Sequence, residues 1–300
     1  MIIKEREIAG KTMRLETGRV ARQSNGSVMV TYGETTILAA VNAAKEPRED
    51  IDFFPLQVEY REKHYAGGKI PGGFFKREAR PSEHEVLTSR VTDRPIRPLF
   101  PKGFKNETQI MITVLQSDGE NMADVLAGVG ASAALMTSTI PWNGPIASVR
   151  VGRIEGKYII NPTRSEIMEC DLEMVVSGNQ ETVVMVEGEA DGVSESEVLD
   201  GLKQAHEVIK EIIDLQNELL SAMDVVKDEV VIPQPDDAMV SAVDEKIGSQ
   251  VDDIVKIVDK KERSSAKDEM VSSILDSLEE SYPSEGKTIK SLIDDRFKAG

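Results

Sequence analysis

The chain has 300 residues, of which 40 % are hydrophobic and 30 % are charged, as in an ordinary globular protein. This length suggests two domains. No apolar run approaches the roughly 20 residues that span a bilayer, and the charged start Met1–Glu7 lacks the apolar segment of a secretory signal. These features exclude a membrane protein and predict a cytoplasmic location. The single cysteine, Cys170, excludes an internal disulfide and a metal cluster made of cysteines alone.

The net charge of −17 argues at first against nucleic acid, because phosphate binding requires lysine and arginine. Between Arg61 and Lys105, however, 11 Lys and Arg residues accompany only 5 Asp and Glu residues. Most charged runs are solvated surfaces. This basic segment also contains Gly72-Gly73 and Phe74-Phe75, which a merely solubilising surface does not require.

Short β-rich runs separated by turn residues predict an antiparallel sheet in the first part of the chain. Asn25-Gly26 and Gly33-Glu34 are the expected hairpin turns. The small residues of 124–135 predict a helix packed tightly against the sheet. The expected strands lie at 13–15, 27–31, 35–39, 53–60, 109–115, 149–160 (a hairpin), 172–176 and 183–186.

Two capping boxes predict helix starts. Ser82 with Glu85 begins a helix that should end before Pro95, because proline clashes with the preceding turn. Ser194 with Glu197 begins a long amphipathic helix. His206 lies beside the apolar stripe of this helix and is interpreted as a packing residue.

A proline-bounded linker follows, and the remaining sequence is helical and polar, with helices expected at 238–258, 264–280 and 284–298. The sequence therefore predicts an α+β domain over 1–228, a linker over 229–235 and a small all-helical domain over 236–300.

The loop that contains Phe74, Phe75, Lys76 and Arg77 is the main candidate site. Adjacent aromatic rings can stack on bases while neighbouring cations contact phosphates, a combination that holds single strands without reading their sequence. The alternative is a buried Phe-Phe pair with solvated flanks. A glycine-rich loop is a poor place to bury two rings, which favours the stacking interpretation.

Three arginines form a second candidate. Arg90 and Arg94 lie four residues apart and hence on one helix face, next to an apolar face made by Leu87 and Val91, and Arg97 follows the expected helix end. Guanidinium groups match phosphate oxygens, so this cluster could bind phosphate. Ion pairs with Glu83, Glu85 and Asp93 are an equally good interpretation for any one of them.

These segments resemble the first ribonuclease PH-type domain of the bacterial polynucleotide phosphorylases over residues 10–230. Residues 236–300 resemble that family's helical domain in helical content and position only. The resemblance rests on four segments: Leu15–Gly18 with Ala21–Gln23, Phe74–Glu83, Asp93–Pro101 and Gly144–Ile146.

The resemblance implies a ribonuclease PH-like fold and a homotrimer that degrades single-stranded RNA, including mRNA, from its 3′ end with inorganic phosphate and Mg²⁺. An RNA-degradation complex is a further expected partner. Phe74 to Arg77 match the loop that grips RNA in the central pore. Four arginines match positions on the RNA and phosphate side: Arg80, Arg90, Arg94 and Arg97.

Where the active half of that family carries Asp, Asp and Lys, this chain has Ile167, Glu173 and Val175. No catalytic residue and no metal ligand are therefore expected here. The chemistry would belong to a second half, and the ending at Gly300 directly after a helix predicts a piece of a longer protein. Two rivals stay open, a non-catalytic ring subunit that only threads RNA and a stand-alone phosphorolytic trimmer of transfer RNA ends. The absent residues count against the trimmer.

Overall fold

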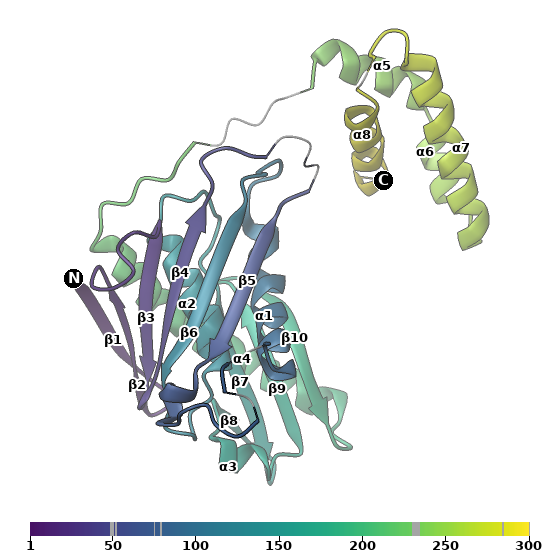
Figure 1. Ribbon diagram of the computed structural model, residues 1–300. Coiled ribbons are helices and arrows are strands. Elements are labelled where there is room, and N and C mark those ends of the chain that lie inside the picture. Colours follow the sequence, from purple (N-terminus) through teal and green to yellow (C-terminus); the bar gives the residue numbers. More distant parts are fainter. Residues whose placement is uncertain are drawn as a thin grey trace. The chain divides into compact units, whose positions relative to one another are not determined.

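The computed structural model describes residues 1–48, 51, 53–74, 76–78, 80–229, 235–283 and 285–299. The chain divides into two compact units, Met1–Val230 and Val231–Gly300, each with its own hydrophobic core (Figure 1). Within the described ranges, no helix is long and apolar enough to cross a membrane.

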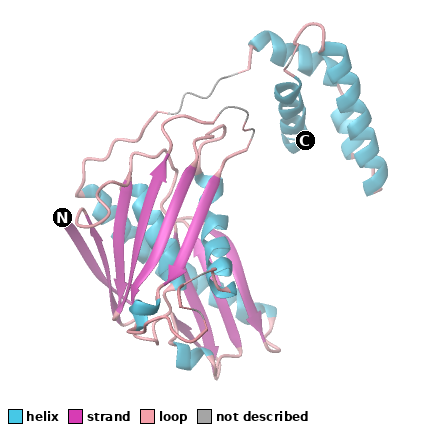
Figure 2. Ribbon diagram, in the orientation of Figure 1, coloured by secondary structure: helices cyan, strands magenta, loops and turns pink. Residues whose placement is uncertain are grey.

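The first unit contains two sheets (Figure 2). Every neighbouring pair of strands is antiparallel except β5 and β6, which run parallel. In spatial order the larger sheet comprises β1 (Ile2–Ile8), β2 (Lys11–Thr17), β3 (Gly26–Tyr32), β4 (Thr35–Ala43), β6 (Thr108–Gln116) and β5 (Leu56–Glu62). The smaller sheet comprises β10 (Val183–Ala190), β9 (Leu172–Gly178), β7 (Ala147–Ile154) and β8 (Lys157–Ile160).

Two helices lie between these sheets (Figure 1). In α2 (Asp124–Met136) every residue from Val125 onward is buried, and the helix contacts β3 and β4 on one side and β7 on the other. A Cβ atom on Gly128 would lie 2.3 Å from Ser148 Oγ, so the absence of a side chain is what permits this approach. The tight packing expected from the small residues is thereby confirmed.

The long helix α4 (Glu195–Ser221) begins at Ser194 with the expected capping box. Its apolar stripe contacts β1, β7 and β9. His206 Nε2 lies 3.0 Å from the carbonyl oxygen of Asn179, in agreement with a packing role. The remaining short elements of this unit are η1 (His64–Gly67), η2 (Arg97–Leu99) and α3 (Arg164–Ile167).

Helix α1 (Glu83–Ile96) starts at Ser82 with the expected capping box, but the predicted end before Pro95 is wrong. Pro95 lies in the last turn, where its ring is buried. The carbonyl groups at this end have partners, because Trp142 Nε1 donates to Ile96 O at 3.0 Å and Arg97 N donates to Asp93 O. Two carbonyl groups of the last turn are thus paired, although proline itself contributes no N–H.

The predicted apolar face of α1 is also wrong, because Leu87 is 42 % exposed and the helix buries Glu85, Thr88 and Thr92 instead. The reason is the neighbouring strand β5, which α1 covers. Strand β5 is an edge strand, and the helix covers that edge. Glu85 Oε1 accepts from Glu62 N at 2.9 Å, and Ser89 Oγ accepts from Tyr60 N at 3.0 Å, so polar side chains satisfy N–H groups that no strand pairs.

Two further differences concern the first strands. Gly33-Glu34 forms the expected turn between the paired residues Tyr32 and Thr35, but Asn25-Gly26 does not, because Gly26 already belongs to β3 and pairs with Val41. Strand β1 was not predicted. Its sequence carries four consecutive charged residues, and it lies at the free edge of the sheet.

The second unit is helical, with α5 (Asp237–Ile247), α6 (Gln250–Val255), α7 (Lys260–Leu278) and α8 (Gly286–Ala299). Gly248, at φ +50°, divides the first expected helix into α5 and α6. Met239, Val243, Ile274 and Ile293 contribute to its core. Together the units form an α+β domain and an all-helical domain, as the sequence predicted for the fold class.

Candidate nucleic-acid interface

The glycine-rich loop connects β5 to α1 and begins where β5 ends (Figure 1). The side chain of Phe74 is 93 % exposed, so this ring is not part of the core. Phe75 lies outside the described residues. Lys76, Arg77 and Arg80 are exposed, and among the described residues none of the three forms an ion pair. The loop therefore presents an aromatic ring beside cations that can meet phosphate oxygens.

Only one of the three helix arginines is similarly available. Arg90 is exposed and has no ion-pair partner in the part of the chain that is described. Arg94 Nη1 lies 2.8 Å from Glu187 Oε2. Arg97 forms a two-bond contact with Asp93, at 2.7 and 2.6 Å, and also donates to the carbonyl groups of Phe54 and Leu56. Arg97 thus pairs with Asp93, one of the three carboxylates of the ion-pair interpretation, whereas Arg94 pairs with Glu187, which was not among them.

Glu78 fixes the end of the loop that precedes α1. Its Oε1 accepts from His64 N at 2.6 Å, and Oε2 lies 3.0 Å from Lys63 Nζ. The backbone N–H of His64 is the largest cause, followed by Lys63, that lowers the pKa of Glu78 to about 2. The carboxylate is charged throughout the neutral range. Glu78 was not predicted as a site residue, although it is the one acidic residue between Glu62 and Glu83.

Ile167, Glu173 and Val175, the positions that correspond to Asp, Asp and Lys in the family's active half, do not fit a metal ion. Ile167 and Val175 offer no ligand atom. The carboxylate of Glu173 contacts Arg150 Nη1, and Arg150 Nη2 contacts Asp124, with the guanidinium only 10 % exposed. Among the described residues no group of three His, Cys, Asp or Glu side chains could hold a metal. Arg150 was missed because its partners lie on two other elements.

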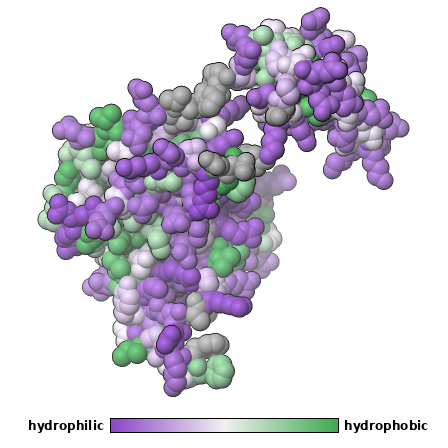
Figure 3. All heavy atoms as spheres, turned by 45° about the horizontal axis from the view of Figure 1, so that its top comes forward, coloured by the Kyte–Doolittle hydropathy of each residue, from purple (hydrophilic) through white to green (hydrophobic). Residues whose placement is uncertain are grey.

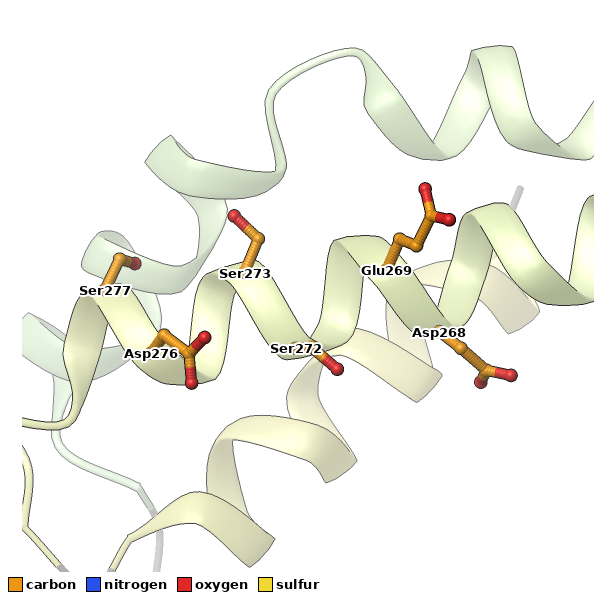
Figure 4. A pocket seen from close by; sticks show the side chains of 6 residues that line it. All are labelled: Asp268, Glu269, Ser272, Ser273, Asp276 and Ser277. Atoms are coloured by element: carbon orange, nitrogen blue, oxygen red, sulfur yellow. The ribbon is translucent and has the colours of Figure 1, made fainter.

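A separate hollow on α7 is lined by acidic residues and serines. Asp268, Glu269 and Asp276 line it together with three serines, and the side chains of Glu269 and Ser273 point away from those of Asp268 and Ser272 (Figure 4). Carboxylates repel a phosphate backbone, so this surface is unsuited to RNA. In the view of Figure 3 most of the surface is hydrophilic, and hydrophobic residues form small separate patches.

Comparisons with known proteins show the family and the fold. The 3′ exoribonuclease family matches in two parts, domain 1 over residues 9–141 and domain 2 over residues 144–208, both inside the first unit. Rice Rrp46 has a similar fold, with a TM-score of 0.57 and 16 % identity over 69 % of this chain and 93 % of that one.

Curated relatives cover more of the chain. Polyribonucleotide nucleotidyltransferase of Thermomicrobium roseum is 49 % identical over 86 % of this chain and 33 % of its own length. The protein of the same name from Syntrophomonas wolfei is 45 % identical over the whole chain and 43 % of its own length. The chain thus spans less than half of the relatives it matches. With a ribonuclease PH-like fold and both family domains in its first unit, the chain belongs to the 3′ exoribonuclease family.

Proposed function

We propose that this chain guides single-stranded RNA within a phosphorolytic 3′ exoribonuclease of the polyribonucleotide nucleotidyltransferase type. The observation that carries the proposal is the exposed ring of Phe74 on a loop whose cations have no carboxylate partners among the described residues. A ring of this kind can stack on any base, and Lys76, Arg77 and Arg80 can contact the phosphates on either side. Arg90 extends the basic surface along α1.

The reaction itself belongs to a part of the protein that this chain does not contain. Ile167, Glu173 and Val175 do not form a metal site, so the chain supplies RNA binding and not phosphorolysis. On the resemblance alone, we also propose that the whole protein uses inorganic phosphate and Mg²⁺, releases nucleoside diphosphates, degrades mRNA, assembles as a homotrimer and acts in the cytoplasm, in contact with an RNA-degradation complex.

A non-catalytic RNA-threading subunit is the second candidate, and the contact between Glu173 and Arg150 favours it as much as the first. Both candidates bind RNA through the same loop. They differ in whether the whole protein releases nucleoside diphosphates from RNA in the presence of phosphate, which is measured directly by chromatography of the products.

Two double variants test the loop. In the aromatic variant, Phe74→Ala with Phe75→Ala, up to two stacking surfaces of about 1–3 kcal/mol each are lost, so affinity for an oligouridylate should fall at every salt concentration. In the basic variant, Lys76→Gln with Arg77→Gln, about two phosphate contacts are lost, so the slope of log affinity against log salt should flatten by roughly 1.4. The measurement is fluorescence anisotropy over a series of salt concentrations.

Lys260→Gln with Lys261→Gln on α7 is the matched control, because it removes the same charge outside the loop and should leave the slope unchanged. Duplex RNA should bind the parent weakly, since its bases are stacked on each other. If the folded aromatic variant binds the oligouridylate as tightly as the parent does, the stacking interpretation is wrong.

A further inference from the structure

The glycine-rich loop that carries Phe74 is attached to the larger sheet at its beginning. Ala66, in η1, is buried, and its carbonyl oxygen accepts from the N–H of Ser117 at 2.9 Å, directly after β6. Lys69 N donates to His64 O at 2.9 Å, so the chain leaves η1 in a fixed direction. Among the described residues that follow, Ile70 to Gly73 form no backbone–backbone hydrogen bond.

The other end of the loop returns to the same place through Glu78. Lys63, the N-cap residue of η1, provides no side-chain cap. Glu78 Oε1 fills that role by accepting from His64 N at 2.6 Å, and the same oxygen lies 3.3 Å from His64 Nδ1. Lys63 Nζ, 3.0 Å from Oε2, adds an ion pair. One carboxylate thus joins both ends of the segment 64–78.

We propose that Glu78 is a positioning residue that closes this segment into a clamped loop and so presents Phe74, Lys76 and Arg77 to RNA. The proposal rests on the proposed function, because Glu78 would act only through a loop that binds RNA and need not touch RNA itself. Restricting the loop before RNA arrives reduces the conformational freedom that binding would otherwise remove.

The sign of the effect separates this role from simple electrostatics. A carboxylate beside a phosphate backbone repels it, so removing a negative charge near the loop should by itself tighten RNA binding. Loss of a clamp should weaken RNA binding instead. Glu83 provides the matched comparison, because it is an exposed carboxylate in the first turn of α1 and forms no ion pair among the described residues.

The experiment compares Glu78→Ala and Glu83→Ala in the 300-residue chain, with an oligouridylate as the probe. We expect Glu78→Ala to bind about threefold to fivefold more weakly, the range that exposed ion pairs support. Glu83→Ala should bind as tightly as the parent or more tightly. Glu78→Gln keeps an oxygen for His64 N but loses the charge that attracts Lys63, so its affinity should lie between those of Glu78→Ala and the parent.

Limited trypsin digestion without RNA provides the second readout. Glu78→Ala should be cleaved after Lys76 at least threefold faster than the parent, while circular dichroism shows an unchanged fold. Glu83→Ala should be cleaved at the parent's rate. Equal cleavage of Glu78→Ala and the parent would overturn the clamp whatever the RNA affinity is.

RNA affinity then decides what the clamp serves. Faster cleavage with undiminished affinity would overturn the positioning role. Adding Glu78→Ala to the aromatic variant should cost less affinity than adding it to the parent, because only Lys76 and Arg77 are then left to position. Failure of the proposed function has a different signature, since the aromatic variant alone would then bind RNA like the parent while Glu78→Ala is still cleaved faster.

Discussion

Replacing Gly128 with alanine tests the close approach of α2 to the smaller sheet. The new Cβ would lie 2.3 Å from Ser148 Oγ and 3.0 Å from Ser148 Cβ. Ser148 is buried and shares a 2.7 Å hydrogen bond with Ser177 Oγ, so its side chain cannot move without leaving a buried hydroxyl unpaired. Neighbouring atoms must shift, because real Cβ contacts are never this short.

Three contributions determine the size of the effect. Overpacking costs about 1–3 kcal/mol, and a buried hydroxyl without a partner costs about 1–3 kcal/mol. Alanine gains about 1 kcal/mol over glycine inside a helix. We therefore expect the free energy of unfolding of the first unit to fall by about 1–5 kcal/mol, which lowers its Tm by about 2–4 °C per kcal/mol.

The fluorescence of Trp142 measures this directly, because Trp142 is the only tryptophan of the chain and is buried in the first unit. Gly201→Ala in α4 is the matched control, since the nearest neighbours of its Cβ would be the terminal methyl of Met174 and the ring edge of Tyr158, both at 3.1 Å. Adding Ser148→Gly should restore part of the lost stability. A Gly128→Ala chain as stable as the parent would refute the reasoning.

Three further outcomes are expected. The purified 300-residue chain should release no nucleoside diphosphates from RNA with phosphate and Mg²⁺, and release above that of a mock purification would contradict this. A protease of broad specificity should cut first within 229–235, most of which lies outside the described residues, and first cuts within 110–200 would contradict the domain boundary. A hydrogen bond with Glu62 raises the pKa of His84 and lowers that of Glu62, so this pair should stabilise the first unit below about pH 6.5 and lose that effect as the pH rises through the raised pKa of His84. A Tm difference between the parent and His84→Gln that is the same at about pH 5.5 and 8.5 would exclude it.

Some local signals were read correctly from the sequence, although the helix end before Pro95 and the turn at Asn25-Gly26 were not. Ser82 and Ser194 both cap their helices as predicted, because a capping box is made by residues three positions apart. The small residues of α2 predicted tight packing, because small side chains allow a helix to approach its neighbour closely wherever that neighbour lies. Such features need no knowledge of the partner element.

Features that depend on a distant partner were missed or wrong. The buried face of α1 is polar because edge N–H groups of β5 need acceptors, which no periodicity within α1 reveals. Glu78 reaches back 14 residues to His64. Of the candidate site, the exposure of Phe74 agrees with the sequence interpretation, and Asp93 was named as a possible partner of the arginines, whereas the ion pair of Arg94 could only be assigned once Glu187 had been placed.

The buried guanidinium of Arg150 limits how a metal site could be introduced beside Glu173. Restoring Asp at position 167 and Lys at position 175 would supply the residue types that are absent, but Glu173 already contacts an internal cation. A metal ion would have to compete with a tethered guanidinium that also contacts Asp124 and never dissociates from the chain. Building a metal site here would therefore require a third, simultaneous change at Arg150. That change alone would leave the carboxylates of Asp124 and Glu173 without their counter-ion.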